Sequence, residues 1–407
     1  MAIQGLPKLM RICFLGYYPL PQSPNSAAYS RLAYLSRRHE VHVLTTRDAA
    51  IPDGIGVNVR VHRMPWPAPP LPGDLRHLVG IVLFGIYAVM RVTALRIRGR
   101  VDFVYTFHNS ECLVAWLLKV TRLRWVVDAF DVPQLNEGDS EYLARKRRFY
   151  FRSLRRWLSM GMRRALPAAD LVITVAMGRD EGGVRILRDD FHVKESRLLA
   201  VPNGVDLSLV RFAPLATGGP GFHLLYVGFV SPRRGVDTLF EACALARAAV
   251  PDLQLHLVGP ANPEDETWLT AETARHLASE WVHYEGPQPH ARVLQCIKDA
   301  DVCVYPFPQT IELDNVLPIK LFEYLAVGRP VIATGLSGAS RIIQEGWNGL
   351  LVEPGSSRAM ADAILRLYSD EKLRARLAAN ARPSVETYDW STIHPKIEQA
   401  MLQVARK

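Results

Sequence analysis

The sequence predicts an α/β protein built from two doubly wound domains, each a parallel sheet covered by helices. The chain has 407 residues, which is more than one hydrophobic core usually serves. Short apolar runs alternate with segments of helical periodicity, and this alternation favours parallel sheets that are buried on both faces. The alternating series occurs twice, and the loose stretch "APLATGGPG" at 213–221 lies between the two.

Each series contains five strand candidates, which are short and rich in branched apolar residues. The first five are 11–16, 41–46, 101–106, 125–129 and 171–175, and the second five are 223–228, 254–259, 302–305, 330–334 and 350–352. Helix-like segments lie between them. We expect an N-terminal domain at 1–205 and a C-terminal domain at 206–387. In such folds ligands bind beyond the carboxyl ends of the strands, and two facing domains would place that crevice between them.

Composition narrows the partners and the compartment. The formal charge of +9 favours anionic partners such as phosphorylated small molecules, nucleic acid or a lipid surface. The five cysteines are far apart, show no metal-ligand spacing and are odd in number, so a disulfide framework is not expected. We find no signal peptide and expect a reducing, cytoplasmic location.

Two segments of the N-terminal half could contact a membrane. The apolar run 78–90 is too short to span a bilayer; it is either a buried helix or a helix lying against a membrane. The stretch 144–166, "ARKRRFYFRSLRRWLSMGMRRAL", has nine Lys or Arg, no acid and interleaved aromatic residues. This pattern fits an anionic membrane surface, although RNA binding or an ordinary solvated helix face would also produce it.

The segment "LLYVGFVSPRRGVDTLFEA", 224–242, predicts a strand that ends at Gly228, a loop with two arginines, and a helix. Arg233 and Arg234 could hold a phosphate, since a guanidinium matches phosphate oxygens and a helix N-terminus attracts anions. An ordinary solvated turn would look the same. Gly259 ends the next strand candidate at the same relative place, where glycine lets a ligand approach the backbone.

The segment "NVLPIKLFEYLAVGRPVIAT", 315–334, is a short, mostly apolar helix that carries a carboxylate. Pro318 at the first turn leaves backbone N–H groups free to face a pyrophosphate. Glu323 lies one to two turns further in, and a carboxylate can accept both neighbouring hydroxyls of a ribose. The alternative is a routine helix pair between Lys320 and Glu323.

These segments, with "VPNGVD" (201–206), "LHLVG", "VHYEG", "ADVCVYPF" and "GWNGLLVEP" in this order, resemble a retaining glycosyltransferase of family 4 with the GT-B fold. The resemblance covers residues 11 to about 395 and is strongest over 201–355. It implies sugar transfer from a nucleotide-sugar to an acceptor hydroxyl without a metal or other cofactor. It also implies that the terminal helix, 388–407, returns to the first domain.

The resemblance assigns the donor site to the C-terminal domain. Glu323 would hold the ribose, and Arg234, in place of the usual lysine, would face the diphosphate. Asn315 stands where the family often has a glutamate near the donor sugar, and Phe229 stands where it often has an arginine. The complete set of expected donor contacts is Gly228, Phe229, Arg233, Arg234, Gly259, Asn315, Leu317, Pro318, Lys320, Leu321 and Glu323.

The N-terminal domain is expected to hold the acceptor. The segment 23–38 opens a helix that Ser23 or Asn25 could cap, and Asn25 and Ser26 stand where relatives often have a glycine-rich loop. His108, Asp128 and Asp131 follow strand candidates. A lone histidine such as His108 is also a common structural residue, and one of the two aspartates could fix the backbone at the end of its strand. We name Arg234, Asn315 and Asp131 as the catalytic candidates.

The sequence therefore predicts a retaining hexosyltransferase of glycan or polysaccharide biosynthesis, peripheral on the inner face of the plasma membrane. The donor is a UDP-sugar, with GDP-mannose as the alternative, and the acceptor is lipid-linked or membrane-associated. Nucleic acid is not expected as a partner. The rival hypotheses are a GT-B sugar-nucleotide epimerase and a nucleotide-binding protein without catalysis. A dehydrogenase is disfavoured because no G-x-G-x-x-G follows the first strand.

Overall fold

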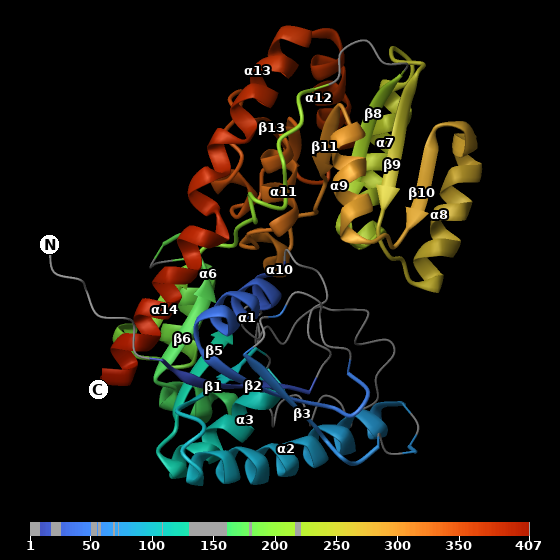
Figure 1. Cartoon of the computed structure of the whole chain (residues 1–407). Helices are drawn as coiled ribbons and strands as arrows, with labels where there is room; N and C mark the ends of the chain where they lie inside the picture. Colours follow the sequence, from blue (N-terminus) through green and yellow to red (C-terminus); the bar gives the residue numbers. More distant parts are fainter. Residues whose placement is uncertain are drawn as a thin grey trace, which may run out of the picture. The chain divides into compact units, whose positions relative to one another are not determined.

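The computed structural model describes residues 9–17, 26–49, 55, 58–67, 70–71, 73–107, 109–129, 161–178, 181–215 and 221–406. The chain divides into two compact units (Figure 1). Unit 1 comprises Met1–Pro202 together with Ile393–Lys407, and unit 2 comprises Asn203–Thr392. The division thus falls between residues 202 and 203, where the sequence prediction has 205 and 206, and the end of the chain belongs to the first unit.

Unit 1 contains a seven-stranded parallel sheet of order β3-β2-β1-β4-β5-β6-β7. Its strands are β1 (Arg11–Gly16), β2 (Glu40–Thr45), β3 (Val59–Arg63), β4 (Phe103–Thr106), β5 (Arg124–Ala129), β6 (Leu171–Val175) and β7 (Leu198–Val201). Its helices include α1 (Ala27–Arg38), α2 (Gly73–Ile97), α3 (Asn109–Leu118), α6 (Gly182–Arg185) and most of α14 (Trp390–Arg406). Figure 1 shows α2 and α3 on one face of the sheet and α1 on the other.

Unit 2 contains a six-stranded parallel sheet of order β10-β9-β8-β11-β12-β13. Its strands are β8 (Phe222–Val227), β9 (Leu253–Val258), β10 (Val282–Gly286), β11 (Val302–Tyr305), β12 (Val331–Thr334) and β13 (Gly349–Val352). Its helices are α7 (Val236–Ala246), α8 (Pro263–Arg275), α9 (His290–Asp299), α10 (Ile311–Asp314), α11 (Ile319–Val327), α12 (Ser357–Ser369) and α13 (Glu371–Ala381). The two sheets confirm the predicted α/β architecture with two doubly wound parallel sheets.

Helix α2 is longer than the apolar run suggests, and the expectation of a segment too short to span a bilayer was wrong. Its residues Val79–Ile97 are long and apolar enough to cross a membrane by length and composition alone, with 39% of them buried. Arg91 interrupts the apolar run in the sequence, but Val92 and Leu95 return to the core of unit 1 and extend the helix. One face of α2 therefore packs in the core, as a buried helix does.

The interior of unit 1 contains a charged pair. Arg31 of α1 and Asp128 of β5 form an ion pair in which both side chains are almost completely buried, and the hydroxyl of Tyr105 donates to the same carboxylate oxygen at 2.9 Å. Burial lowers the pKa of Arg31 to about 10. The pair fixes α1 onto the sheet, because separating the two charges inside the core is costly.

We predict that Asp128→Ala destabilises the protein by about 3–5 kcal/mol, because it leaves the Arg31 guanidinium buried without its counter-charge. The double variant Arg31→Met, Asp128→Leu is the control and should lose less, since it removes both charges. Thermal and urea unfolding measure the difference. If Asp128→Ala unfolds like the unmodified protein but loses activity, Asp128 contacts the acceptor instead, as the sequence predicts.

Candidate donor site in unit 2

The first part of the site is the loop after β8. Gly228 has a φ of +147° and donates its N–H to the Val258 carbonyl at 2.9 Å. The hydroxyl of Tyr226 donates to the Phe229 carbonyl at 2.8 Å and fixes the next residue. Gly259, at the end of β9, has a φ of +140°, and a Cβ there would overlap the Gly228 carbonyl oxygen. Only glycine meets both demands, so the carboxyl ends of β8 and β9 lie in close backbone contact.

Two cations lie beside this loop. The Lys320 ammonium lies against Gly228, where an added Cβ would meet its Nζ, and is 5.0 Å from the ring centre of Tyr226 and 4.9 Å from that of Phe307. The Arg234 guanidinium is 5.1 Å from the same Phe307 ring. Burial, followed by the charge of Arg234, lowers the pKa of Lys320 to about 7. Arg233, the neighbour of Arg234, is exposed.

Lys320 has no ion-pair partner within the described part of the chain, and the predicted alternative of a Lys320–Glu323 pair is not formed there. Aromatic faces compensate a cation only partly. An enclosed ammonium next to a guanidinium is therefore a position where an anion would be strongly stabilised.

The N-terminus of α11 supplies further donors. Pro318 is the residue before the helix and adopts an extended conformation, rather than the first helical position predicted. The N–H groups of Ile319 and Lys320 begin the helix and have no carbonyl four residues back within it. The preceding residue, Leu317, is buried, and its carbonyl accepts from the Asn203 side chain at 2.6 Å. Asn203, from the "VPNGVD" segment, thereby fixes the approach to α11.

Glu323 is 7% exposed and is hydrogen-bonded to a residue that the sequence did not predict. Nε2 of His290, the first residue of α9, is 2.6 Å from the Glu323 carboxylate. The pair spans thirty-three positions, so no local spacing could reveal it. The second carboxylate oxygen of Glu323 makes no hydrogen bond with the described residues, which leaves it available to a ligand hydroxyl.

The remaining donor candidates surround this core. Leu321 is fully buried and packs α11. Asn315 follows α10 directly and is exposed. The carboxylate of Asp314 accepts from the Ser337 N–H at 3.1 Å and from its hydroxyl at 2.7 Å, which fixes the backbone that carries Asn315. Its contact with a donor sugar stays a prediction.

The acceptor candidates are only partly described. The Ser26 hydroxyl accepts from the Tyr29 N–H at 3.2 Å and caps α1. Asp128 is buried with Arg31 rather than exposed to a ligand. Asn25, His108 and Asp131 lie outside the described residues. Within the described ranges, no group of three or more His, Cys, Asp or Glu side chains could hold a metal ion.

Comparison with known proteins identifies both halves of the chain. Residues 213–384 match the family model "Glycosyl transferases group 1", and residues 26–204 match "Glycosyl transferase 4-like domain". The phosphatidyl-myo-inositol mannosyltransferase of Mycobacterium leprae is 31% identical over 52% of the chain and 54% of its own length. The chain thus spans about half the length of this relative.

A second relative and a solved structure match over most of the chain. The D-inositol 3-phosphate glycosyltransferase of Thermobispora bispora is 25% identical over 90% of the chain and 86% of its own length. The structure of Anabaena HepE in complex with UDP has a TM-score of 0.67 and 19% identity, and covers 97% of this chain and 100% of HepE. At that identity the structural match shows the fold alone.

We predict that Glu323→Ala weakens UDP or GDP binding by about 1.5–3 kcal/mol, because a hydrogen bond to a charged acceptor is lost. Calorimetric titration measures the affinity. Glu272→Ala is the matched control, since Glu272 also pairs with a histidine, His276, at 3.1 Å, but on α8. Unchanged affinity in a folded Glu323→Ala protein would reduce Glu323 to a partner of His290.

We also predict that UDP binding at pH 8 takes up a proton. With its pKa lowered to about 7, Lys320 is mostly neutral at this pH, and a bound diphosphate favours the charged form. Titration in buffers of different ionisation enthalpy measures the uptake, which should approach roughly one proton. Lys320→Met should abolish it, whereas proton uptake that persists in this variant would assign the titrating group elsewhere.

Proposed function

Because the chain belongs to the group 1 glycosyltransferases of family 4 and has the GT-B fold, we propose that it transfers a sugar with retention from a nucleotide-sugar. The acceptor is a hydroxyl of a lipid-linked or membrane-associated molecule in glycan biosynthesis. One observation carries the proposal: Lys320 and Arg234 present positive charge at the carboxyl edge of the sheet beside two glycine strand ends. This arrangement suits the diphosphate of a nucleotide-sugar.

The donor is a UDP-sugar in this proposal, which the UDP bound to the structurally similar HepE supports. GDP-mannose is the alternative, and the mannosyltransferase name of the mycobacterial relative supports it. Both curated relatives are named for inositol-containing molecules, one of them a phospholipid. These names favour a phosphorylated or lipid acceptor, without selecting one.

The proposed reaction places growing negative charge on the diphosphate leaving group. The glycosidic bond to the diphosphate breaks, and its electrons leave with the phosphate oxygen. Lys320, Arg234 and the first N–H groups of α11 stabilise that growing negative charge. The acceptor hydroxyl attacks the anomeric carbon from the same face and gives its proton to the departing phosphate. These fixed donors supply the positive charge at the diphosphate, so we propose that no metal or other cofactor is required.

We predict that Arg234→Ala lowers kcat more than it weakens donor binding, because negative charge at the diphosphate increases in the transition state. The measurement compares kcat with the Kd of the intact donor. Arg233→Ala is the control and should change both less, since its side chain is exposed. A change in Kd alone would remove Arg234 from the chemical step.

The same assay separates the proposal from its rivals. Release of free nucleotide that requires an acceptor indicates transfer. An epimerase would convert the nucleotide-sugar without an acceptor, and a binding protein would leave it intact. A panel of UDP- and GDP-sugars scored by thermal shift selects the donor beforehand, because a ligand that binds the native state raises its stability.

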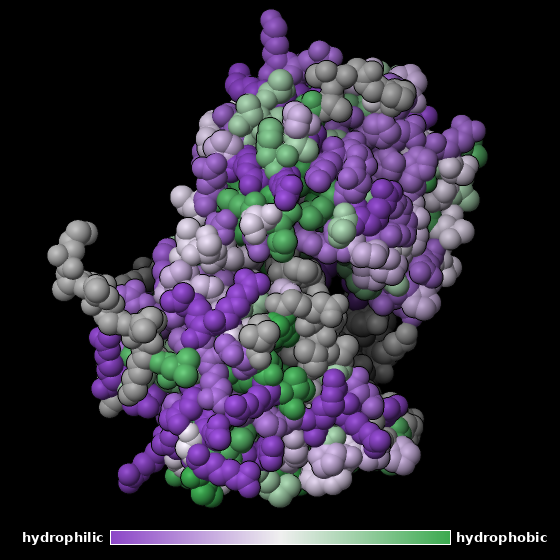
Figure 2. All heavy atoms as spheres, in the orientation of Figure 1, coloured by the Kyte–Doolittle hydropathy of each residue, from purple (hydrophilic) through white to green (hydrophobic). Residues whose placement is uncertain are grey.

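We further propose that the protein is cytoplasmic and peripheral on a membrane, and the outer face of α2 supports this. Leu75, Val82, Ile86 and Met90 are between 45% and 54% exposed along this helix, and the last three recur every four residues, on one face. Figure 2 shows hydrophobic atoms over α2 among hydrophilic ones. The sequence leaves open whether this segment is a buried helix or a helix lying against a membrane. In our proposal α2 is both, because one face packs in the core and the other would contact the membrane.

Most of the basic stretch 144–166 lies outside the described residues. At its end, Met162, Ala165 and Leu166 are buried in the core of unit 1, whereas Arg163 and Arg164 are exposed. This end therefore has the alternation of a core-facing and a solvated face. The remaining seven cations stay a predicted membrane contact.

We predict that Val82→Ser, Ile86→Ser, Met90→Ser together reduce binding to anionic vesicles about 100-fold. Each half-exposed side chain contributes about 1 kcal/mol on insertion. Vesicle co-sedimentation measures the loss. Leu209→Ser, Leu245→Ser is the control, because these residues of unit 2 are similarly exposed, at 50% and 48%. Equal binding by all three proteins would contradict contact through α2.

A further inference from the structure

Unit 1 has a cationic pocket that the proposed function does not use. It has a volume of about 910 Å³, within the range of small-molecule sites. Among the described residues that line it, one is a carboxylate, Asp170, and six are cations: Arg96, Lys119, Arg122, Arg124, Lys194 and Arg197. The pocket is therefore strongly positive.

Several of these cations are held in place without losing their charge. Arg124 donates to the carbonyls of Val404 and Ala405, both at 2.9 Å. Arg197 donates to the carbonyls of Pro167 at 2.8 Å and Ala169 at 3.0 Å. Carbonyl partners fix a guanidinium but carry no formal charge. The guanidinium groups of Arg124 and Arg197 are thus fixed in place by carbonyl groups and are not members of ion pairs with the described residues.

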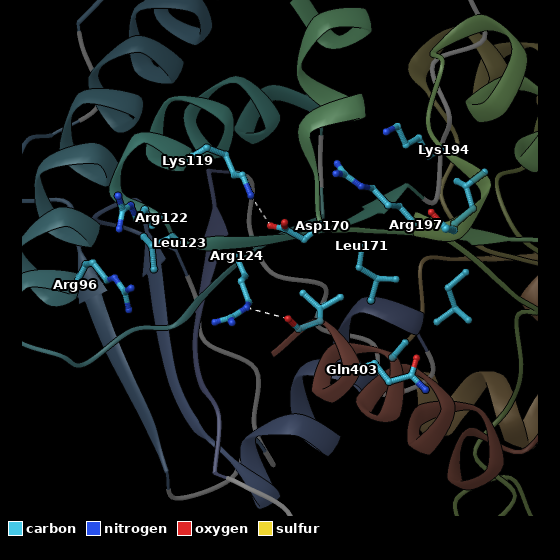
Figure 3. Close-up of a pocket in the computed structure, with 15 residues that line it drawn as sticks. Arg96, Lys119, Arg122, Leu123, Arg124, Asp170, Leu171, Lys194, Arg197 and Gln403 are labelled. Carbon is cyan, nitrogen blue, oxygen red and sulfur yellow. Dashed lines mark hydrogen bonds and ion pairs between the residues drawn. The ribbon is translucent and has the colours of Figure 1, made fainter. Parts of the chain in front are cut away.

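Among the described residues, two of the pocket cations have a carboxylate partner: Lys119 pairs with Asp170 at 2.6 Å, and Arg96 pairs with Asp102, outside the pocket, at 3.6 Å. The same carboxylate oxygen of Asp170 also accepts from the Trp125 N–H at 2.7 Å. The charge of Asp170 is therefore directed at Lys119 and the backbone, and not at the other pocket cations. Arg122 and Lys194 are exposed, and their side chains make no hydrogen bond or ion pair with the described residues. Figure 3 shows Arg96 and Arg122 towards one side of the pocket and Lys194 towards the other, with Asp170 between them. The positive charge is spread along the pocket instead of focused on one point.

The pocket is at the edge of the sheet opposite to the expected acceptor edge. Arg124, Leu171 and Leu198 are the first residues of β5, β6 and β7, so the pocket lies where these strands begin. Asp128 is near the other end of β5, and the length of that strand separates the two edges by about 16 Å. A ligand here would not occupy the crevice at the carboxyl ends, where doubly wound folds bind substrates.

We propose that this pocket binds the phosphate groups of an elongated anionic ligand. Phosphate oxygens match guanidinium donors in geometry and charge, and a chain of phosphates matches cations distributed over both sides. The ligand is either a soluble compound with several phosphates or the phosphate head groups of lipids. The proposal is independent of the donor site, because no residue of the pocket belongs to unit 2.

The test compares two double variants of the full chain. Arg122→Gln, Lys194→Gln removes the two exposed pocket cations. Arg37→Gln, Arg47→Gln removes two exposed cations of unit 1 that do not line the pocket and has the same net charge. Tripolyphosphate is titrated calorimetrically into each protein with saturating UDP present, so that the proposed donor site is already filled. A second arm measures co-sedimentation with phosphatidylcholine vesicles, with and without phosphatidylglycerol.

The pocket variant should lose tripolyphosphate affinity by at least about tenfold, because charged hydrogen bonds are removed, while the control binds like the unmodified protein. Loss of tripolyphosphate binding indicates a soluble ligand. Loss confined to vesicles with phosphatidylglycerol indicates lipid phosphates. Equal behaviour of the two double variants in both arms overturns the proposal, since only the net charge would then matter.

Discussion

Close contact between backbone segments at the carboxyl ends of β8 and β9 is the constraint on which the donor site depends. Gly228 and Gly259 adopt φ values of +147° and +140°, and a Cβ at Gly259 would overlap the Gly228 carbonyl. A side chain at Gly259 would push the two strand ends apart, and a side chain at Gly228 would displace Lys320. Because both are glycine, the Lys320 ammonium can lie directly against the backbone. The two glycines thus determine both the backbone geometry of the loop after β8 and the position of Lys320 beside it.

That position makes charge, rather than shape, the main property of the site. Lys320 is enclosed by Tyr226, Tyr305 and Phe307, and burial, followed by the charge of Arg234, lowers its pKa. Three residues further along α11, the carboxylate of Glu323 is already hydrogen-bonded to His290. In the proposed function, the diphosphate of the donor would lie at the first position and a ligand hydroxyl at the second. One short helix would then contact both parts of the donor.

Local patterns predicted most of the fold, and the differences have physical causes. All ten predicted strands are present, because each is an apolar run that both faces of the sheet bury. Strand β3 was missed because its sequence, VRVHR, is polar and mostly exposed at the sheet edge. Strands β7 and β10, which were not predicted either, are also edge strands.

The candidate site residues Gly228, Lys320 and Glu323 were named from the sequence, whereas His290 was not, since its contact depends on how α9 packs against α11. The buried state of Asp128 likewise required Arg31, which is distant in sequence.

The two units share a topology but differ in where their cations lie. In unit 2, Lys320 and Arg234 stand at the carboxyl ends of the strands without a paired carboxylate among the described residues. In unit 1, Arg31 lies on the helix after β1, at the corresponding edge, and Asp128 neutralises it inside the core. The cations of the pocket gather instead where β5, β6 and β7 begin. A buried pair stabilises structure only while both partners remain, so Arg31 is not available to an anion. In the described part of unit 1, the pocket cations therefore lie at the opposite edge of the sheet from the buried Arg31–Asp128 pair.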